Sequence, residues 1–141
     1  MRSAFSLFLV LHGIAHLRGF LVPWRLAAPA EMPYTTTVLG GSADLGTVGI
    51  RIVSILWLLT SVAFVVAGAA TFLEDAAWRT IAITATLASL AITLLGWPQS
   101  QIGLALNLLL LAYLILGGSP EHVFTAGSHF LHSPWTRLTV R

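Results

Sequence analysis

Residues 47–73 read TVGIRIVSILWLLTSVAFVVAGAATFL, an apolar run that contains a single charged residue, Arg51. A run of about 20 apolar residues is long enough to cross the hydrocarbon core of a bilayer as an α-helix. Three more stretches have the same character, at about 3–23, 80–97 and 102–118. The sequence therefore predicts an all-α fold, a polytopic integral membrane protein whose residues 1–118 form a four-helix transmembrane bundle.

The composition supports this fold class and excludes several functions. The chain is 57% hydrophobic and 9% charged, whereas soluble domains carry about a quarter charged residues. Its seven basic residues are all arginines scattered along the chain, so the lipid bilayer is the expected partner and nucleic acid is not. The absence of cysteine excludes disulfides, thiolate metal sites and iron–sulfur clusters.

The segments between the spans predict how the helices are connected. A long loop at 24–46 follows the first span, and the short polar turns at 74–79 and 97–101 predict an antiparallel series for the other three. Tryptophan side chains favour membrane interfaces, and four of the five fall at or beyond the predicted span ends: Trp24, Trp78, Trp97 and Trp135. Trp57 lies inside the second span and is interpreted as a packing residue.

The arginines predict the orientation. If the N-terminus is inside, the cytoplasmic side holds Arg2, Arg79, Arg137 and Arg141, and the outer side holds Arg18, Arg25 and Arg51. This bias favours a bacterial cytoplasmic (inner) membrane protein with both termini in the cytoplasm. Ala28-Pro29-Ala30 resembles a signal-peptide cleavage site, but the charged and polar residues within 3–23 favour a retained helix.

The C-terminal residues 119–141 follow the breaker Gly117-Gly118-Ser119-Pro120 and are expected to form a cytoplasmic tail with an amphipathic segment. The tail carries three histidines, His122, His129 and His132. On the predicted topology they lie far from the histidines of the first span, so a combined five-histidine site is not expected.

His12 and His16 are the most unusual feature of the sequence. Their i, i+4 spacing places both imidazoles on one face of the first span. Ionisable residues at membrane depth are costly and mark candidate functional sites, and this spacing also suits a shared metal ion. The alternative is that both histidines stay neutral and hydrogen-bond between helices.

A metal site on this pair needs further ligands. The spans themselves contain no Asp, Glu or additional His, so Asp44 or Glu31 would have to fold back from the first loop to join a divalent metal. The same shortage disfavours a single-chain bis-histidine haem, a di-iron carboxylate centre and an exporter that depends on a membrane-embedded acid.

Three further polar residues complete the set of candidate ligand-binding residues. Arg51 lies near the start of the second span, while Gln101 and Asn107 lie in the first half of the fourth. With both termini inside, they share the outer half of the membrane with His16, which predicts a polar pocket under the loop. The alternatives are snorkelling for Arg51, a hydrogen bond to the adjacent turn for Gln101 and a hydrogen bond between helices for Asn107. Small residues are interpreted as packing seams, namely Ala63, Ala67 and Gly68 in the second span and Ala85, Ser89 and Thr93 in the third.

Two segments carry a resemblance: Leu11-His12-Gly13-x-x-His16-Leu17-x-Gly19-Phe20, and Trp97 followed by Gly103, Asn107 and Leu108. They resemble the N-terminal membrane region of an uncharacterised bacterial protein family, in whose longer members this region precedes a soluble domain. The resemblance implies a four-helix bundle and a shared polar cluster of His12, Gly13, His16, Gly19, Gly103 and Asn107. It implies no activity.

Two functional hypotheses follow. The first is a small membrane subunit or binding module, whose intramembrane polar pocket holds a lipophilic ligand such as a quinone or lipid, or which packs against a larger membrane partner or a second copy of itself. The second is a metal-dependent membrane enzyme acting on a lipid, with His12, His16 and Asp44 as ligands. Only the second requires a bound metal.

Overall fold

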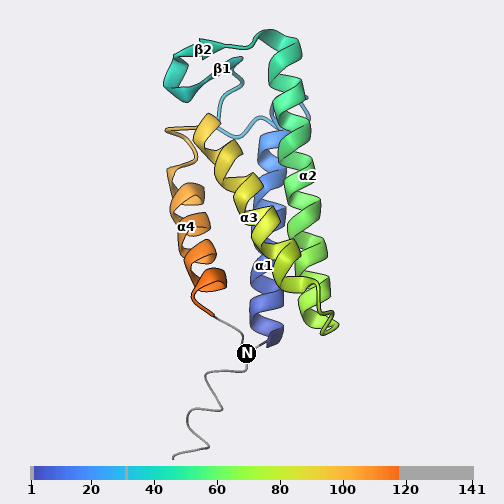
Figure 1. The fold of residues 1–141 in the computed structure, drawn as a ribbon. Coiled ribbons are helices and arrows are strands. Elements are labelled where there is room, and N and C mark those ends of the chain that lie inside the picture. Colours follow the sequence, from blue (N-terminus) through green and yellow to red (C-terminus); the bar gives the residue numbers. More distant parts are fainter. Residues whose placement is uncertain (1, 31, 118–141) are drawn as a thin grey trace, which may run out of the picture.

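The computed structural model describes residues 2–30 and 32–117 and is almost entirely helical (Figure 1). Four helices follow in order: α1 (Arg2–Leu21), α2 (Gly46–Phe72), α3 (Trp78–Leu95) and α4 (Gln101–Ile115). The predicted all-α fold class is confirmed, and each helix lies within a few residues of its predicted span. The predicted tail, including His122, His129 and His132, lies outside the described residues, as does Glu31.

Three of the helices are long and apolar enough to cross a membrane. The sequence predicted a fourth full span at 102–118, but α4 has 15 residues, about 22 Å at 1.5 Å per residue. The hydrocarbon core is about 30 Å thick. Because Gly117 has a positive φ of 94°, which ends α-helices, α4 is the short member of the bundle.

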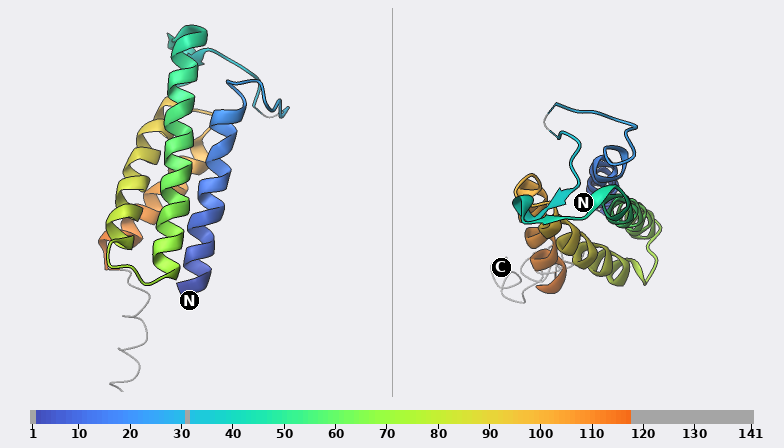
Figure 2. Two further views of the ribbon diagram at one scale, coloured as in Figure 1. Left: turned by 90° about the vertical axis from the view of Figure 1, so that its right-hand side faces the viewer. Right: turned by 90° about the horizontal axis from the view of Figure 1, so that it is seen from above.

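The loop between α1 and α2 contains a small β-hairpin. Strands β1 (Thr37–Val38) and β2 (Ala43–Asp44) pair antiparallel, and the 3-10 turn η1 (Leu39–Gly41) connects them. The backbone N–H of Gly40 donates to the carbonyl of Trp97 at 2.7 Å. This bond attaches the hairpin to the turn between α3 and α4, so the loop covers one end of the bundle (Figures 1 and 2).

Helices α1 and α2 pack very closely. A Cβ atom at Gly13 would lie 2.8 Å from the carbonyl oxygen of Ser61, and one at Gly68 would lie 2.9 Å from that of Ser6. In both places the serine hydroxyl donates to the glycine carbonyl, Ser61 Oγ to Gly13 at 2.6 Å and Ser6 Oγ to Gly68 at 2.8 Å. Small residues and hydroxyl bonds of this kind hold transmembrane helices together.

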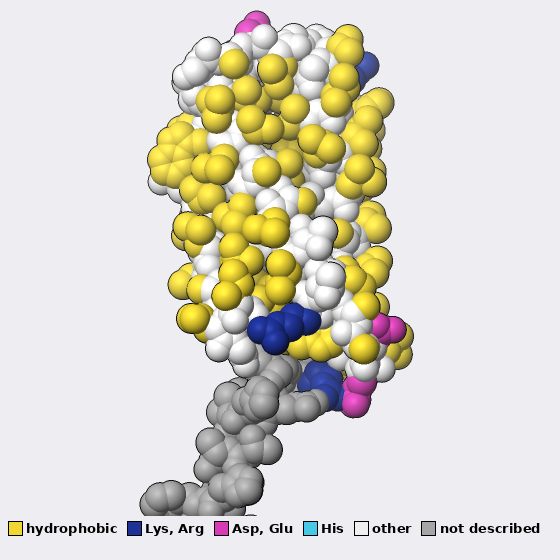
Figure 3. Space-filling model, viewed as in Figure 1, with side chains coloured by type: hydrophobic (Ala, Val, Ile, Leu, Met, Phe, Trp, Pro, Cys, Tyr) yellow, Lys and Arg dark blue, Asp and Glu magenta, His cyan; other side chains and the backbone are white. Residues whose placement is uncertain are grey.

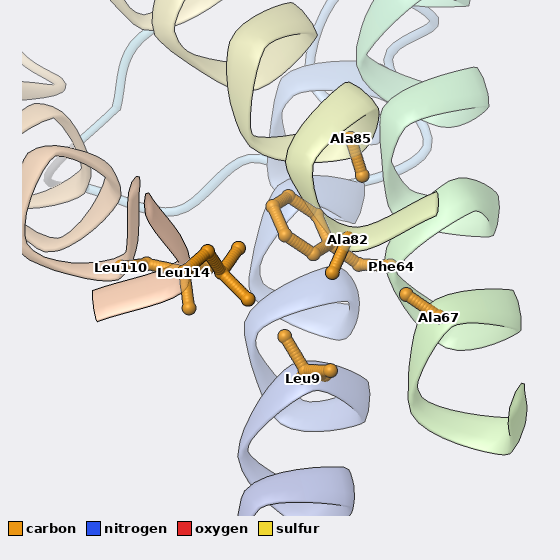
Figure 4. Close-up of a cluster of buried hydrophobic side chains, with 7 residues drawn as sticks. All are labelled: Leu9, Phe64, Ala67, Ala82, Ala85, Leu110 and Leu114. Carbon is orange, nitrogen blue, oxygen red and sulfur yellow. The ribbon is translucent and has the colours of Figure 1, made fainter. Parts of the chain in front are cut away.

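The apolar core lies in the half of the bundle away from the loop. Phe64 of α2 occupies its centre (Figure 4), fully buried. Around it lie side chains from all four helices, namely Leu9, Ala67, Ala82, Ala85, Leu110 and Leu114. The predicted seam residues Ala67 and Ala85 are thus part of this core.

The outer surface of the bundle is strongly apolar. Large hydrophobic side chains are exposed on every helix, among them Leu7, Val48 and Leu109, and Figure 3 shows hydrophobic side chains over most of one face with charges near its ends. The interior instead holds many buried hydroxyls and polar groups. This distribution suits lipid as the surrounding solvent, and it agrees with a multi-pass membrane protein.

Charged residues mark the end of the bundle opposite the loop. Arg2 forms an ion pair with Glu74, and the Arg79 guanidinium donates to the carbonyl of Leu114. The start of α1, the α2–α3 turn and the end of α4 therefore meet at one end, as antiparallel spans require.

Candidate functional site: a buried polar cycle beneath a loop-covered pocket

His12 and His16 both point into the bundle. Their exposed fractions are 7% and 4%, and their imidazole centroids lie 4.8 Å apart. The i, i+4 spacing thus places both rings on the inner face of α1, as the sequence predicted.

The two histidines are joined to α3 and α4 by a closed ring of four hydrogen bonds. His12 Nε2 lies 2.9 Å from Asn107 Oδ1, and Asn107 Nδ2 donates to Ser89 Oγ at 2.6 Å. Ser89 Oγ lies 2.5 Å from His16 Nε2, and His16 Nδ1 lies 2.9 Å from the carbonyl oxygen of His12. We call these four residues the polar cycle.

The chemistry of the groups sets the direction of each bond. The carbonyl oxygen of His12 only accepts, so His16 carries a proton on Nδ1. Because burial without a counter-charge favours the neutral imidazole, its Nε2 accepts from the Ser89 hydroxyl, which in turn accepts from Asn107 Nδ2. The Asn107 oxygen accepts from His12 Nε2–H. With these tautomers, assigned from the network, both imidazoles are neutral and all four bonds run in one direction.

Aromatic side chains pack against the two imidazoles of the polar cycle. Phe64 packs against both imidazoles, with centroid distances of 4.7 Å to His12 and 5.4 Å to His16. Phe8 stacks on His12 at 5.7 Å, and Trp57 lies 5.3 Å from His16. Because buried polar groups are costly unless they are hydrogen-bonded, the cycle gives His12, His16 and Asn107 the partners they need at this depth.

The cycle engages most of the groups that a metal would use. Both nitrogens of His16 and Nε2 of His12 are hydrogen-bonded, which leaves His12 Nδ1 as the one imidazole nitrogen without a partner among the described residues. No group of three or more His, Asp or Glu side chains suited to a metal occurs within 2–30 and 32–117.

Three of the sequence's candidate residues lie apart from the polar cycle. Arg51 places its guanidinium 5.2 Å from the Trp24 ring, and Gln101 is an exposed residue at the first position of α4. Asp44 is exposed on β2, where its carboxylate accepts from the Gly46 N–H at 2.9 Å. Hydrogen bonds from the Thr36 side chain and the Gly46 backbone lower the pKa of Asp44. This carboxylate therefore stabilises the loop.

A cavity of about 380 Å³ lies under the hairpin, and we call it the loop pocket. Its walls come from the end of α1, the loop, the first half of α2 and the turn after α3. Most of the lining side chains are apolar, including Val22, Val53 and Leu95. None of the five candidate ligand-binding residues lines it.

Trp57 connects the loop pocket to the polar cycle. It lines the cavity, its ring faces His16, and a Cβ atom at Gly19 would overlap it. Gly19 lies three residues after His16 on α1 and also lines the cavity. The pocket therefore lies about one helical turn from the histidines, with an indole between them.

Ser89 is the member of the polar cycle that sequence reasoning missed. Ser89 was interpreted as part of a packing seam, yet it is fully buried and bonds to two helices. Trp57 packs against Gly19 and His16, in agreement with its interpretation as a packing residue, and it also lines the loop pocket; its depth inside an apolar span was the available signal. A serine among several hydroxyl residues on α3 carried no comparable signal.

No protein-family model, no curated protein and no solved structure matches this chain. The resemblance of its two motifs to a bacterial membrane-protein family stays a prediction.

Proposed function

We propose that this protein is a small, non-enzymatic membrane binding module that holds a lipophilic ligand, a quinone or a lipid, in the loop pocket. The observation that carries the proposal is the pocket itself, about 380 Å³ and mainly apolar, at one end of a membrane-type bundle. Ligand sites are commonly apolar cavities of about 300–1,000 Å³ with a few polar groups.

The polar cycle has a supporting role in this proposal. Its hydrogen bonds connect α1, α3 and α4 directly beneath the pocket. Binding sites need a rigid frame to avoid the entropic cost of ordering their walls. His12, His16 and Asn107 thus act as the base that keeps the pocket open, while its lining contacts the ligand.

The metal-dependent enzyme has less support. It would require His12 and His16 to exchange their present hydrogen bonds for a metal, and Asp44 to leave the loop bond to Gly46. A neutral ligand in the loop pocket requires neither change.

We also infer that the protein lies in the inner membrane of a bacterium with both termini in the cytoplasm. Arg2 and Arg79 lie at the end of the bundle opposite the loop, and basic residues favour the cytoplasmic side. On this orientation the loop pocket opens toward the outer side of the membrane.

Filling the pocket tests the proposal. Val53 lines the cavity, so Val53→Trp should displace the ligand, whereas Val62→Trp on the exposed face of the same helix should not. The measurement is native mass spectrometry of protein purified in mild detergent. We expect wild type and Val62→Trp to retain a small organic mass that Val53→Trp lacks. A Val53→Trp protein that is folded and retains the same mass would overturn the proposal.

A further inference from the structure

The polar groups of the loop pocket restrict the chemistry of a ligand, given the proposed binding function on which this inference rests. Among the residues that the structure describes, no charged side chain lines it. The Arg51 guanidinium lies instead over the Trp24 ring. A charged group in an apolar cavity needs an opposite charge or several hydrogen bonds, and the described lining of the pocket offers no cation for an anionic headgroup. The ligand part that enters it is therefore neutral.

The lining hydroxyls already have partners. Ser54 Oγ donates to the carbonyl of Arg51 at 2.6 Å and accepts from Trp24 Nε1 at 2.8 Å. Thr35 Oγ1 and Thr37 Oγ1 lie 2.8 Å apart, and the Thr37 backbone N–H donates to Thr35 Oγ1. Ser54 therefore uses both its donor and an acceptor within the wall, while the one O–H that the threonine pair leaves unused lies at an exposed position where water can satisfy it.

The indole N–H of Trp57 is different, because it makes no hydrogen bond to any residue that the structure describes. The indole lies between two glycines of the lining: a Cβ atom at Gly19 would overlap its fused ring system, and one at Gly96 would lie 3.4 Å from Cζ2, the carbon beside the N–H edge. The lining also contains Trp97 and Gln99, but both are exposed and water can satisfy them. Trp57 thus supplies a partly buried donor that lacks an acceptor.

We infer that the loop pocket binds the head of a neutral, carbonyl-bearing ring compound of the quinone class, and that the ligand carbonyl accepts a hydrogen bond from Trp57 Nε1–H. A carbonyl supplies the missing acceptor without adding charge. Apolar and aromatic walls from Val22, Pro23 and Trp97 suit a flat ring. An alkyl tail can leave toward the lipid around the bundle.

The test compares three lipophilic ligands that separate the carbonyl group, the alkyl tail and the anionic headgroup. Decylubiquinone carries a tail and carbonyls, decylbenzene carries the same tail without carbonyls, and phosphatidylglycerol carries an anionic headgroup. Affinities are measured by isothermal titration calorimetry on the full chain in detergent. The variants are Trp57→Phe, which keeps a ring but removes the N–H, and Trp78→Phe, a matched control at the opposite end of the bundle.

We expect wild type and Trp78→Phe to bind decylubiquinone in preference to the other two ligands. Loss of one hydrogen bond in Trp57→Phe should weaken decylubiquinone binding by about tenfold and leave decylbenzene binding unchanged. A second readout does not depend on affinity: the indole ¹⁵N–H resonance that disappears in Trp57→Phe should shift with decylubiquinone and stay in place with decylbenzene.

The outcomes separate this inference from the proposed function. Three results would each overturn the quinone inference: equal binding of decylubiquinone and decylbenzene, an unmoved indole resonance, or preferred binding of phosphatidylglycerol. In each of these cases, loss of the retained ligand in Val53→Trp would still support a binding module. No binding of any of the three, together with no effect of Val53→Trp, would overturn both.

Discussion

Asn107 has no exposed surface, and its side chain forms hydrogen bonds to residues on two other helices. Its amide is suited to this position because it supplies an acceptor to His12 and a donor to Ser89 at the same time. Ser89 similarly accepts from Asn107 and donates to His16. Each member of the polar cycle is used once as donor and once as acceptor, so loss of one side chain leaves two groups without partners.

Replacing Asn107 with leucine should therefore destabilise the bundle. Asn107→Leu leaves His12 Nε2–H without its acceptor and Ser89 without its donor, and it should lower the free energy of unfolding by about 1–3 kcal/mol. Leu108→Ala, on the exposed side of α4, should change it far less. Equilibrium unfolding in mixed detergent measures both.

A double-mutant cycle isolates the bond itself. In a His12→Phe background the donor is already absent, so adding Asn107→Leu should cost less than it does in wild type. If the losses in unfolding free energy of the two single variants simply add in the double variant, Asn107 and His12 contribute independently, which would contradict the closed cycle.

At the scale of elements, the contact between α1 and α2 sets the frame for the site. Gly13 and Gly68 let the two backbones approach, and Ser61 and Ser6 bond across the interface. Gly13 immediately follows His12, so the position of this contact also sets the depth and rotation of the histidine pair relative to α2. Helix packing and the polar site are thus specified by the same stretch of α1.

Gly13→Ala tests this frame. The added Cβ atom would lie 2.8 Å from the Ser61 carbonyl oxygen and 3.0 Å from Phe64 Cβ, so α1 and α2 must separate. Overpacking of this kind costs about 1–3 kcal/mol. Ala15→Val adds bulk to the exposed side of the same helix and should be nearly neutral. Thermal unfolding in detergent measures the melting temperatures of the two variants. Equal melting temperatures would contradict close packing at Gly13.

At the scale of the whole molecule, α4 is shorter than the hydrocarbon core of a bilayer is thick. Its end is held by the Arg79 guanidinium, which donates to the Leu114 carbonyl. Arg79 follows the α2–α3 turn, so both segments lie at the same end of the bundle. A helix shorter than the bilayer is accommodated by local thinning of the bilayer and by its flanking residues.

Because the chain contains no cysteine, single-cysteine variants report the side of each segment. We expect Ser42→Cys in the hairpin to react from the outer side with a maleimide that cannot cross membranes. Asp75→Cys and Leu116→Cys should react only when the cytoplasmic side is accessible. Labelling of whole cells and of inverted vesicles measures this. Reaction of Leu116→Cys on the same side as Ser42→Cys would show that α4 does not cross.

The sequence by itself determined the class of fold, the approximate ends of the helices and the histidine pair on one face of α1. These features depend on local properties: apolar length, interfacial residues and the 3.6-residue helical period act within a single segment. The rotation of α3 and α4 about their axes depends on packing between segments far apart in the chain. Only the tertiary structure therefore joined Ser89 and Asn107 to the histidines, kept Arg51, Gln101 and Asp44 apart from them, and formed the loop pocket beside Trp57.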